Sequence, residues 1–467
     1  MVTRVSRTPD APTTTPTVAP DPGHATGGKR HPVSFRPVEH PQQARAADLL
    51  APLLRALVGS TVPVRFEFWD GSGVGPADGV GTIRIRSVDA VRRILWAPGE
   101  LGVARAFVSG DLTVEGDIYA LLRVLHRATP PALHQTSLAM IPTVIEAARR
   151  LGALGPPLPA PPEESRPVGR MHSPSRDARA ISHHYDVGNE FYRLVLGPTM
   201  TYSCARFTAD GTTLEEAQAA KHELICRKLG IDRRPGARLL EVGCGWGSMA
   251  IHAARHHRAQ VVGVALSREQ VDAARIRVAE AGLADRVEIR LQDYRDLRGD
   301  QFDAISSIGM FEHVGTLRMA RYFETMRELL TSTGRFLNHA ISKPGGSVLG
   351  RRTFVGRYVF PDGELLDVAQ VILAMQRSGF EVRDVESLRE HYSKTLHHWV
   401  TNLEAHWDEA VSLVGLPRAD IWHLYMAASA NGFDDGGLAI HQVLGVVPEP
   451  GGRSGMPPTR SSWEHAG

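Results

Sequence analysis

Short apolar runs alternate with amphipathic helical stretches from residue 178 onward, and this pattern constrains the fold more than any other feature. The strand-like runs are ARLLEV (237–242), QVVGVAL (260–266), RVEIRLQ (286–292), FDAISSI (302–308) and GRFLNHA (334–340). The helical stretches include GSMAIHAARHH, REQVDAARIRVAEAG and MARYFETMRELL. This alternation predicts a doubly wound α/β sheet. Because ligands of such sheets bind at the carboxyl ends of the strands, we expect the functional residues along that edge.

A glycine-rich turn, LLEVGCGWGSM, follows the first of these strands and opens a helix. Gly243, Gly245 and Gly247 allow a sharp turn and the close approach of a ligand, and the helix N-terminus offers free N–H groups. Nicotinamide, flavin and S-adenosylmethionine sites all use such a turn, and a purely structural turn is the alternative. The second strand ends in GVALSREQ, without the carboxylate that holds a dinucleotide ribose. This ending, together with the G-x-G-x-G spacing, disfavours a nicotinamide.

Two polar residues, Glu312 and His313 in SSIGMFEHVG, follow the fourth strand-like run. Their position places them on the same edge of the predicted sheet as the glycine turn. We interpret the carboxylate as part of a site and His313 as a residue that orients the loop.

The residues before 178 predict a smaller domain and a connector. Residues 43–127 indicate a small α+β domain, with a helix in AADLLAPLLRALVG, a strand in VPVRFEFWDGSG, and a strand followed by a helix in GTIRIRSVDAVRRILW. ARAFVSGDLTVEGD (104–117) reads as loop because Gly and Asp interrupt it. Residues 128–177 predict a linker, made of an amphipathic helix (138–154) and an extended Pro-rich spacer.

The two ends of the chain are poor in large apolar side chains. Residues 1–42 and 449–467 are rich in Pro, Thr, Gly and Ser, and we expect both tails to be disordered.

Composition excludes several classes of function. The formal charge of the 467 residues is only +2, so no nucleic acid partner is expected. Three cysteines are too few and too scattered for a disulfide framework or a zinc site, and the adjacent His183 and His184 lack a ligand spacing, so we expect no metal. Without an apolar leader or a long uncharged run, the sequence predicts a cytoplasmic protein whose membrane contact is peripheral.

Several motifs occur in one order along most of the chain. They are ISHHYDVGNEFYRLVLGPTMTYSCARF, LLEVGCGWGS, GVALSREQ, IGMFEHVG, RYVFPDGEL and HYSKTLHHW. The chain thereby resembles the cyclopropane-fatty-acyl-phospholipid synthases, which are related to the mycolic acid cyclopropane synthases and the 10-methylene fatty acid methyltransferases. The resemblance implies a Rossmann-like class I methyltransferase domain over 178–448, dependent on S-adenosylmethionine, with a lipid-associated domain over 43–127.

The resemblance also implies the residues that line the S-adenosylmethionine pocket. These are Tyr202, Ser203, Glu241, Gly243, Cys244, Gly245, Trp246, Gly247, Leu266, Gln270 and Tyr294. Gln270 would supply polar contacts where a dinucleotide enzyme uses Asp or Glu.

Closing a cyclopropane ring requires a base that removes a proton from the newly added methyl group. In the resembling family this base is a bound bicarbonate. The residues that would hold it here are Glu312, His339, Tyr392, Ile341 and the backbone of Cys204. We interpret the Cys204 thiol as a small buried group, since the reaction needs no covalent thioether. Ser429 replaces a cysteine found in some members of the family, so that thiol is not required either.

The expected reaction is transfer of a one-carbon unit to the cis double bond of an unsaturated phospholipid acyl chain, forming a cyclopropane. A methyl-branching enzyme that makes a 10-methylene chain, with a reductase as partner, is the alternative within the family. A methyltransferase for a soluble small molecule and a non-catalytic lipid-binding protein are alternatives of other classes.

The resemblance is also compatible with a homodimer, and it predicts a location on the inner face of the membrane. KPGGSVLGRRTFVGRYVFPDGEL, with Lys343, Arg351, Arg352 and Arg357 beside apolar residues, suits a lipid headgroup.

Overall fold

The computed structural model describes residues 45–59, 63–128, 133–166, 169, 171–185, 187–348 and 352–464. The predicted tail 1–42 lies outside these residues, and so does Arg351.

The N-terminal domain is built on a four-stranded sheet in the order β2-β1-β3-β4. Its elements are α1 (Ala46–Val58), β1 (Arg65–Phe68), β2 (Gly73–Val74), β3 (Gly81–Ile85), α2 (Val88–Trp96), α3 (Glu100–Val108), β4 (Leu112–Gly116) and α4 (Ile118–Ala128). Alternate residues of β1 and β3, such as Phe66 and Ile83, point into the core because side chains alternate across a strand. The predicted helix 46–59 and both predicted strands are confirmed.

The prediction of a loop over 104–117 is wrong. This segment holds the second half of α3 and all of β4, and Ala104, Ala106 and Val108 are buried. Gly110 and Asp111 mark only the turn between the two elements, where Gly110 has a φ of 73°.

The linker packs along the N-terminal domain. After α5 (Leu133–Arg150) the Pro-rich segment follows α2, and its carbonyl groups accept hydrogen bonds from Arg92, Arg93 and Trp96 at 2.7–2.8 Å. Further on, the buried Glu164 pairs with Arg105 of α3, at 2.6 and 2.8 Å. These contacts satisfy polar groups in a segment that has no secondary structure of its own.

A seven-stranded sheet in the order β12-β13-β9-β8-β5-β6-β7 forms the centre of the large domain. Its strands are β5 (Arg238–Val242), β6 (Gln260–Ala265), β7 (Val287–Leu291), β8 (Phe302–Ile308), β9 (Leu330–Ser342), β12 (Glu381–Ser387) and β13 (Ala439–Val446). The first five are parallel, as predicted, and β13 runs antiparallel between β9 and β12. The order of the strands reverses at β5, because β6 adds to one side of it and β8 to the other. Such a switch point leaves a crevice for a ligand at the carboxyl end of β5.

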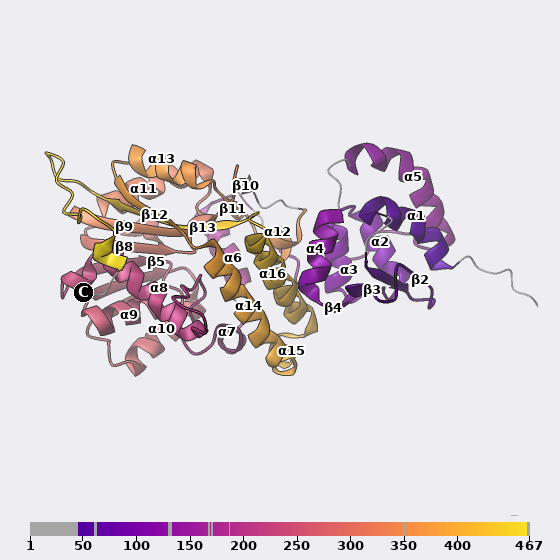
Figure 1. Ribbon diagram of the computed structural model, residues 1–467, viewed down its shortest axis with the longest axis horizontal. Coiled ribbons are helices and arrows are strands. Elements are labelled where there is room, and N and C mark those ends of the chain that lie inside the picture. The colour runs from indigo at the N-terminus through magenta and orange to yellow at the C-terminus, as the bar shows by residue number, and fades with distance from the viewer. Residues whose placement is uncertain are drawn as a thin grey trace, which may run out of the picture. The chain divides into compact units, whose positions relative to one another are not determined.

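Helices cover both faces of this sheet (Figure 1). Apolar residues of α8 (Leu214–Leu229), α9 (Ser248–His257) and α10 (Arg268–Glu280) pack on one face. Those of α11 (Met319–Glu328) and α13 (Val368–Arg377) pack on the other. The remaining short elements are η1 (Ile231–Arg233), η2 (Tyr294–Asp296), η3 (Phe311–His313), η4 (Thr316–Arg318), β10 (Ser347–Val348) and β11 (Glu364–Leu365).

A third apolar cluster lies beside the carboxyl ends of the strands, where helices pack on one another. It draws on α6 (Pro174–Tyr185), α7 (Asn189–Leu196), α12 (Phe354–Tyr358), α14 (Arg389–Ala405), α15 (Trp407–Val414) and α16 (Leu416–Asp434), and α3 of the N-terminal domain joins it. The large domain begins a few residues before the predicted boundary at 178, because His172 Nε2 lies 3.0 Å from Glu364 Oε1.

The C-terminal segment differs from our expectation of a disordered tail over 449–467. Residues 461–464 form α17 (Ser461–Glu464), and Trp463 is only 4% exposed. Arg460 pairs with the buried Asp384 at 2.5 Å, and Arg233 donates to the carbonyl of Ser462 at 2.6 Å. One aromatic anchor and two arginine contacts thus fix a segment whose composition is that of a flexible tail.

Candidate active site

The glycine turn joins β5 to α9 and forms the floor of a cavity. Gly243 and Gly247 have φ values of 80° and 78°, which lie in the left-handed region that favours glycine. A Cβ at Gly243 would lie 3.1 Å from side-chain atoms of Met310, so the turn also needs a small residue there. The turn is closed by the amide of Gly247, which donates to Cys244 O at 2.8 Å.

The cavity above this turn has a volume of about 130 Å³. Of the residues predicted to hold the cofactor, ten line it: Tyr202, Ser203, Glu241, Gly243, Cys244, Gly245, Trp246, Leu266, Gln270 and Tyr294. Gly247 instead precedes the first residue of α9, whose N-terminus faces the turn. The structure therefore brings together residues from three of the quoted motifs, with Tyr294 from a fourth segment, at the edge where the sheet predicts a ligand.

Lys221 and Glu241 are oppositely charged residue types buried in the wall of this first cavity. Lys221 of α8 is fully buried and donates to Ser203 Oγ at 2.8 Å, and burial lowers its pKa to about 8. Burial raises the pKa of Glu241 to about 8. Glu241 Oε2 has no hydrogen-bond partner among the described residues, so it is open to a polar or cationic group of a ligand.

The sequence analysis missed Lys221, although a signal was present. Leu214, Ala217, Lys221, Leu224 and Ile225 follow the spacing of one helix face, and four of the five are apolar. A lysine on the apolar face of a helix indicates a buried functional or structural cation.

A second, smaller cavity adjoins the first and contains all five residues predicted for catalysis: Cys204, Glu312, His339, Ile341 and Tyr392. Both cavities are lined by Tyr185, Tyr202, Ser203, Gly309 and His313. The second cavity has a volume of about 60 Å³, enough for a few groups the size of a water molecule. The segments that meet here lie far apart in the sequence.

Glu312 lies on η3, just beyond the carboxyl end of β8. Its Oε1 accepts the backbone N–H of Ile341 at 2.7 Å, while Oε2 is buried and unpaired within the part of the chain that the structure describes. Burial raises the pKa of Glu312 to about 7, although the bond from Ile341 lowers it. The backbone N–H of Ile341 is therefore already paired with Glu312, and the role predicted for Ile341 in holding a bicarbonate stays a prediction.

His339 lies on β9 and is 1% exposed. Its Nδ1 lies 3.1 Å from Nε2 of Gln442 on β13, and its Nε2 has no partner among the residues described. Burial lowers the pKa of His339, and the charges of Lys221 and Lys228 lower it further, so the ring is neutral. Gln442 was not predicted, because only the pairing of β13 with β9 brings it to this ring.

Tyr392 of α14 and Cys204 complete the second cavity. Burial raises the pKa of the Tyr392 hydroxyl, which therefore remains protonated and able to donate. Burial also raises the pKa of the Cys204 thiol, and Sγ points toward the carbonyl of Ala205 at 3.1 Å. A protonated thiol is a poor nucleophile, which agrees with our interpretation of Cys204.

Contacts bear on two other expectations. His184 is buried and its Nδ1 lies 3.0 Å from Val359 O, which is a structural role. The side chain of His183 lies outside the described residues. Arg357 donates to Ser165 O of the linker at 3.0 Å, and its expected contact with a lipid headgroup stays a prediction.

The fold and the first cavity define a class of protein. Five parallel strands, an antiparallel β13 beside β9 and a glycine turn after β5 form the sheet and pocket of an S-adenosylmethionine-dependent methyltransferase. The residues fit this cofactor, since the turn admits its close approach and Glu241 Oε2 is an unpaired acceptor. Residues 172–443 match the family described as mycolic acid cyclopropane synthetase, and the chain belongs to this family.

Relatives and solved structures agree with this assignment. A "probable fatty acid methyltransferase" of Mycobacterium tuberculosis is 41% identical over 413 residues, covering 86% of this chain and 95% of the relative. The cyclopropane-fatty-acyl-phospholipid synthase of Escherichia coli is 38% identical over 261 residues, which cover 56% of this chain and 66% of the relative. Among solved structures, mycolic acid cyclopropane synthase CmaA1, complexed with SAH and CTAB, is 33% identical with a TM-score of 0.54, covering 58% of this chain and 98% of that one. The cyclopropane synthase MmaA2 of M. tuberculosis is 30% identical with a TM-score of 0.54, and the match covers 59% of this chain and 98% of that one.

Proposed function

We propose that this methyltransferase acts on the cis double bond of an unsaturated phospholipid acyl chain and that its main product is a cyclopropane. One observation carries the choice of the reacting site, and the names of the family and of the Escherichia coli relative support a cyclopropane product. Glu312 Oε2 and His339 Nε2 are both buried, both lack a partner among the described residues, and both belong to one cavity beside the cofactor cavity. A buried cavity that holds unpaired polar atoms beside apolar side chains is suited to hold a small polar species next to the reacting carbon atoms.

A bicarbonate ion fits these groups. Neutral His339, with its proton on Nε2, and the protonated Tyr392 hydroxyl are donors, whereas the Glu312 carboxylate is an acceptor for the hydroxyl of the ion. The volume of about 60 Å³ suits an ion of this size. The ion would supply the base that removes a proton from the added methyl group.

The protein's own residues position and protect the reacting groups. S-Adenosylmethionine supplies an electrophilic methyl group, and the substrate is an alkene, which is a weak nucleophile. Tyr202, Tyr425 and Phe360 surround the second cavity, and their ring faces stabilise positive charge that develops on the acyl chain while they exclude water. Holding both reactants in line supplies much of the rate.

The apolar lining and the names of the relatives support a lipid substrate. Phe360, Leu365 and Ile440 line the second cavity beside the polar groups. The relatives that are 41% and 39% identical are each named "probable fatty acid methyltransferase". We therefore propose that this protein also acts on a fatty acyl chain.

We further propose that the enzyme is cytoplasmic and reaches its substrate from the inner face of the membrane. Ile141 and Ile145 lie one turn apart on α5 and are 46% and 51% exposed, and Trp96 and Leu154 are 56% and 54% exposed. Such side chains suit peripheral docking. No helix within the described ranges is long and apolar enough to cross a bilayer.

A methyl-branching reaction is the second candidate. The names of the two relatives above favour it, as does a 33% identical tuberculostearic acid methyltransferase of M. tuberculosis. In that reaction the acyl chain, after a hydride shift, loses a proton from its own carbon atoms, and a separate reductase completes the methyl branch. The base in the second cavity serves either outcome.

Product analysis tests the proposal. The protein is incubated with methyl-deuterated S-adenosylmethionine and oleoyl-phospholipid vesicles, and the fatty acids are analysed by gas chromatography–mass spectrometry. A cyclopropane that retains two deuterium atoms supports the main proposal, whereas a methylene or methyl branch supports the second candidate. Label only in a soluble acceptor would contradict both, and the absence of any label would indicate a non-catalytic lipid-binding protein.

A further inference from the structure

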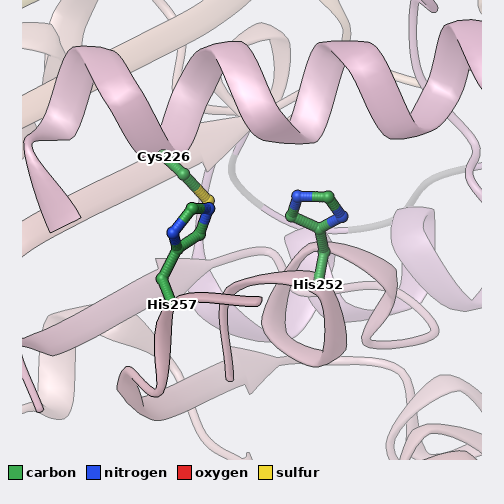
Figure 2. A group of neighbouring side chains, drawn as sticks. All are labelled: Cys226, His252 and His257. Atoms are coloured by element: carbon green, nitrogen blue, oxygen red, sulfur yellow. The ribbon is translucent and has the colours of Figure 1, made fainter. Parts of the chain in front are cut away.

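Outside both cavities, α8 and α9 bring together three side chains of the kinds that bind transition metals. Cys226 lies on α8, and His252 and His257 lie on α9. One sulfur or nitrogen atom of each residue lies within 4.8 Å of the others. Figure 2 shows the Cys226 sulfur pointing from α8 toward the His257 ring, with the His252 ring facing them across a gap.

Glu223 lies beside this group on the same face of α8, although its carboxylate is not one of the three grouped donors. It precedes Cys226 by three residues, and residues three apart are neighbours on a helix. Glu223 Oε2 lies 2.8 Å from His257 Nε2 and 3.3 Å from His252 Nε2. In a tetrahedral site with bonds of about 2.0–2.1 Å, neighbouring nitrogen and oxygen ligands are about 3.3 Å apart, so the contacts of Glu223 with the two rings already have the spacing of such a site.

The surroundings hold these donors in place. Cys226 is fully buried, and the side chains of His252, His257 and Glu223 are 13%, 12% and 27% exposed. Arg227 donates to Glu223 Oε1 at 2.7 Å, which fixes the carboxylate and leaves Oε2 directed at the two rings. Such contacts beyond the ligands orient them for a metal.

We propose that Cys226, His252 and His257 bind one divalent transition metal ion of the zinc class. A thiolate and two imidazoles select zinc-like ions over magnesium or calcium, and Glu223, which contacts both imidazoles, can shift to supply the fourth ligand of a closed site. On binding, the Cys226 thiol releases its proton to solvent and both imidazoles bind in their neutral form. The ion joins α8 to α9, and the cavity-lining residues Lys221 and Ser248 lie on these two helices.

This site was not predicted from the sequence, because only the cysteines and the two adjacent histidines were considered as ligands. A site with mixed ligands on two different helices has no such local pattern. In the absence of an ion, the same contacts form a cluster in which Glu223 accepts from both histidines. The test must therefore detect the metal–sulfur bond itself and must not rely on activity.

Cobalt(II) is the probe. The full-length protein, purified without a histidine tag, is stripped with a chelator, reduced and titrated with Co(II). We expect one equivalent to produce tetrahedral visible bands and a near-ultraviolet thiolate-to-cobalt band, and Zn(II) to abolish both. Cys226→Ser should remove the charge-transfer band, and His257→Gln should weaken Co(II) binding at least tenfold.

His256→Gln is the matched control, because this ring lies 4.5 Å from that of His252 but is not part of the group of donors. It should leave the titration unchanged. Circular dichroism and S-adenosylmethionine binding verify the fold of each variant, and His257→Gln decides the question if Cys226→Ser does not fold. Absence of the charge-transfer band in the unmodified protein, or its persistence in Cys226→Ser, would overturn the proposal.

Discussion

The side-chain amide of Gln442 donates to Nδ1 of His339 at 3.1 Å, and the two residues are direct partners in the register of β13 and β9. Because Nδ1 accepts this bond, the neutral ring carries its proton on Nε2, the atom without a partner among the described residues. Gln442 is itself fully buried. It therefore acts as a positioning residue that decides whether His339 offers a donor or an acceptor to the second cavity.

Gln442→Glu should reverse this arrangement. A carboxylate of nearly the same shape accepts from Nδ1–H, which leaves Nε2 without its proton. We expect the rate of methyl transfer to fall at least about tenfold, with S-adenosylmethionine affinity nearly unchanged. Nitrogen-15 NMR of His339 reads the tautomer directly. A slower enzyme with an unchanged tautomer would assign Gln442 a purely structural role.

Glu312→Gln should abolish turnover and leave cofactor binding intact. The amide retains the shape of the side chain and can still accept the Ile341 N–H, but it cannot become an anion. Without the carboxylate that holds the base, we expect the rate to fall by the factor of about 100 to 10,000 that acid–base catalysis contributes, and Glu312 does not line the first cavity. Single-turnover kinetics and calorimetric titration with S-adenosylmethionine measure the two effects separately. Activity that survives this change would show that the carboxylate has another role.

The same substitution should change stability in a pH-dependent way. The pKa of Glu312 is about 7 in the folded protein, above its ordinary value of 4.5, so folding favours the protonated form. The stability from protonation is fully present below about pH 4.5 and is lost as pH rises from there through about 7. Glu312→Gln should match the wild type near pH 4 and exceed it by up to about 3 kcal/mol above pH 8. Urea unfolding at both pH values tests this, and equal stability at high pH would contradict the burial of a charge at this position.

Cys204→Ser should retain most of the activity. Only the backbone of Cys204 is expected to help hold the bicarbonate, and burial keeps the thiol of Cys204 protonated. A serine hydroxyl can make the same contact with Ala205 O. Turnover within a few-fold of wild type, together with no alkylation of Cys204 in the native protein, is the expected result. A loss as large as that of Glu312→Gln would place the thiol in the reaction.

The sequence could predict the features that follow from local residue patterns. The parallel strands, the glycine turn and the place of Glu312 follow from periodicity and from the rule that ligands bind at strand ends. No element was predicted beyond residue 340. For α16 the reason is that this helix is buried around most of its circumference and shows no polar face. The pairing of β13 with β9, which joins Gln442 to His339, depends on strand order and has no local signal. The role of Cys226 beside His252 and His257 likewise required the packing of α8 on α9.

A few contacts hold the C-terminal segment in place, although its composition is typical of a disordered tail. Trp463 is 4% exposed, and Arg460 pairs with Asp384, which also binds the buried Lys228 at 2.9 Å. Trp463→Ala should destabilise the protein by about 3 kcal/mol, since it empties a buried aromatic site. Leu317→Ala, at a residue that is 88% exposed, should change stability by less than about 0.5 kcal/mol. Deletion of residues 449–467 should cost at least as much as Trp463→Ala, because it also leaves Asp384 without Arg460. Urea unfolding of the three variants makes the comparison, and a truncated protein as stable as the full chain would restore the expectation of a disordered tail.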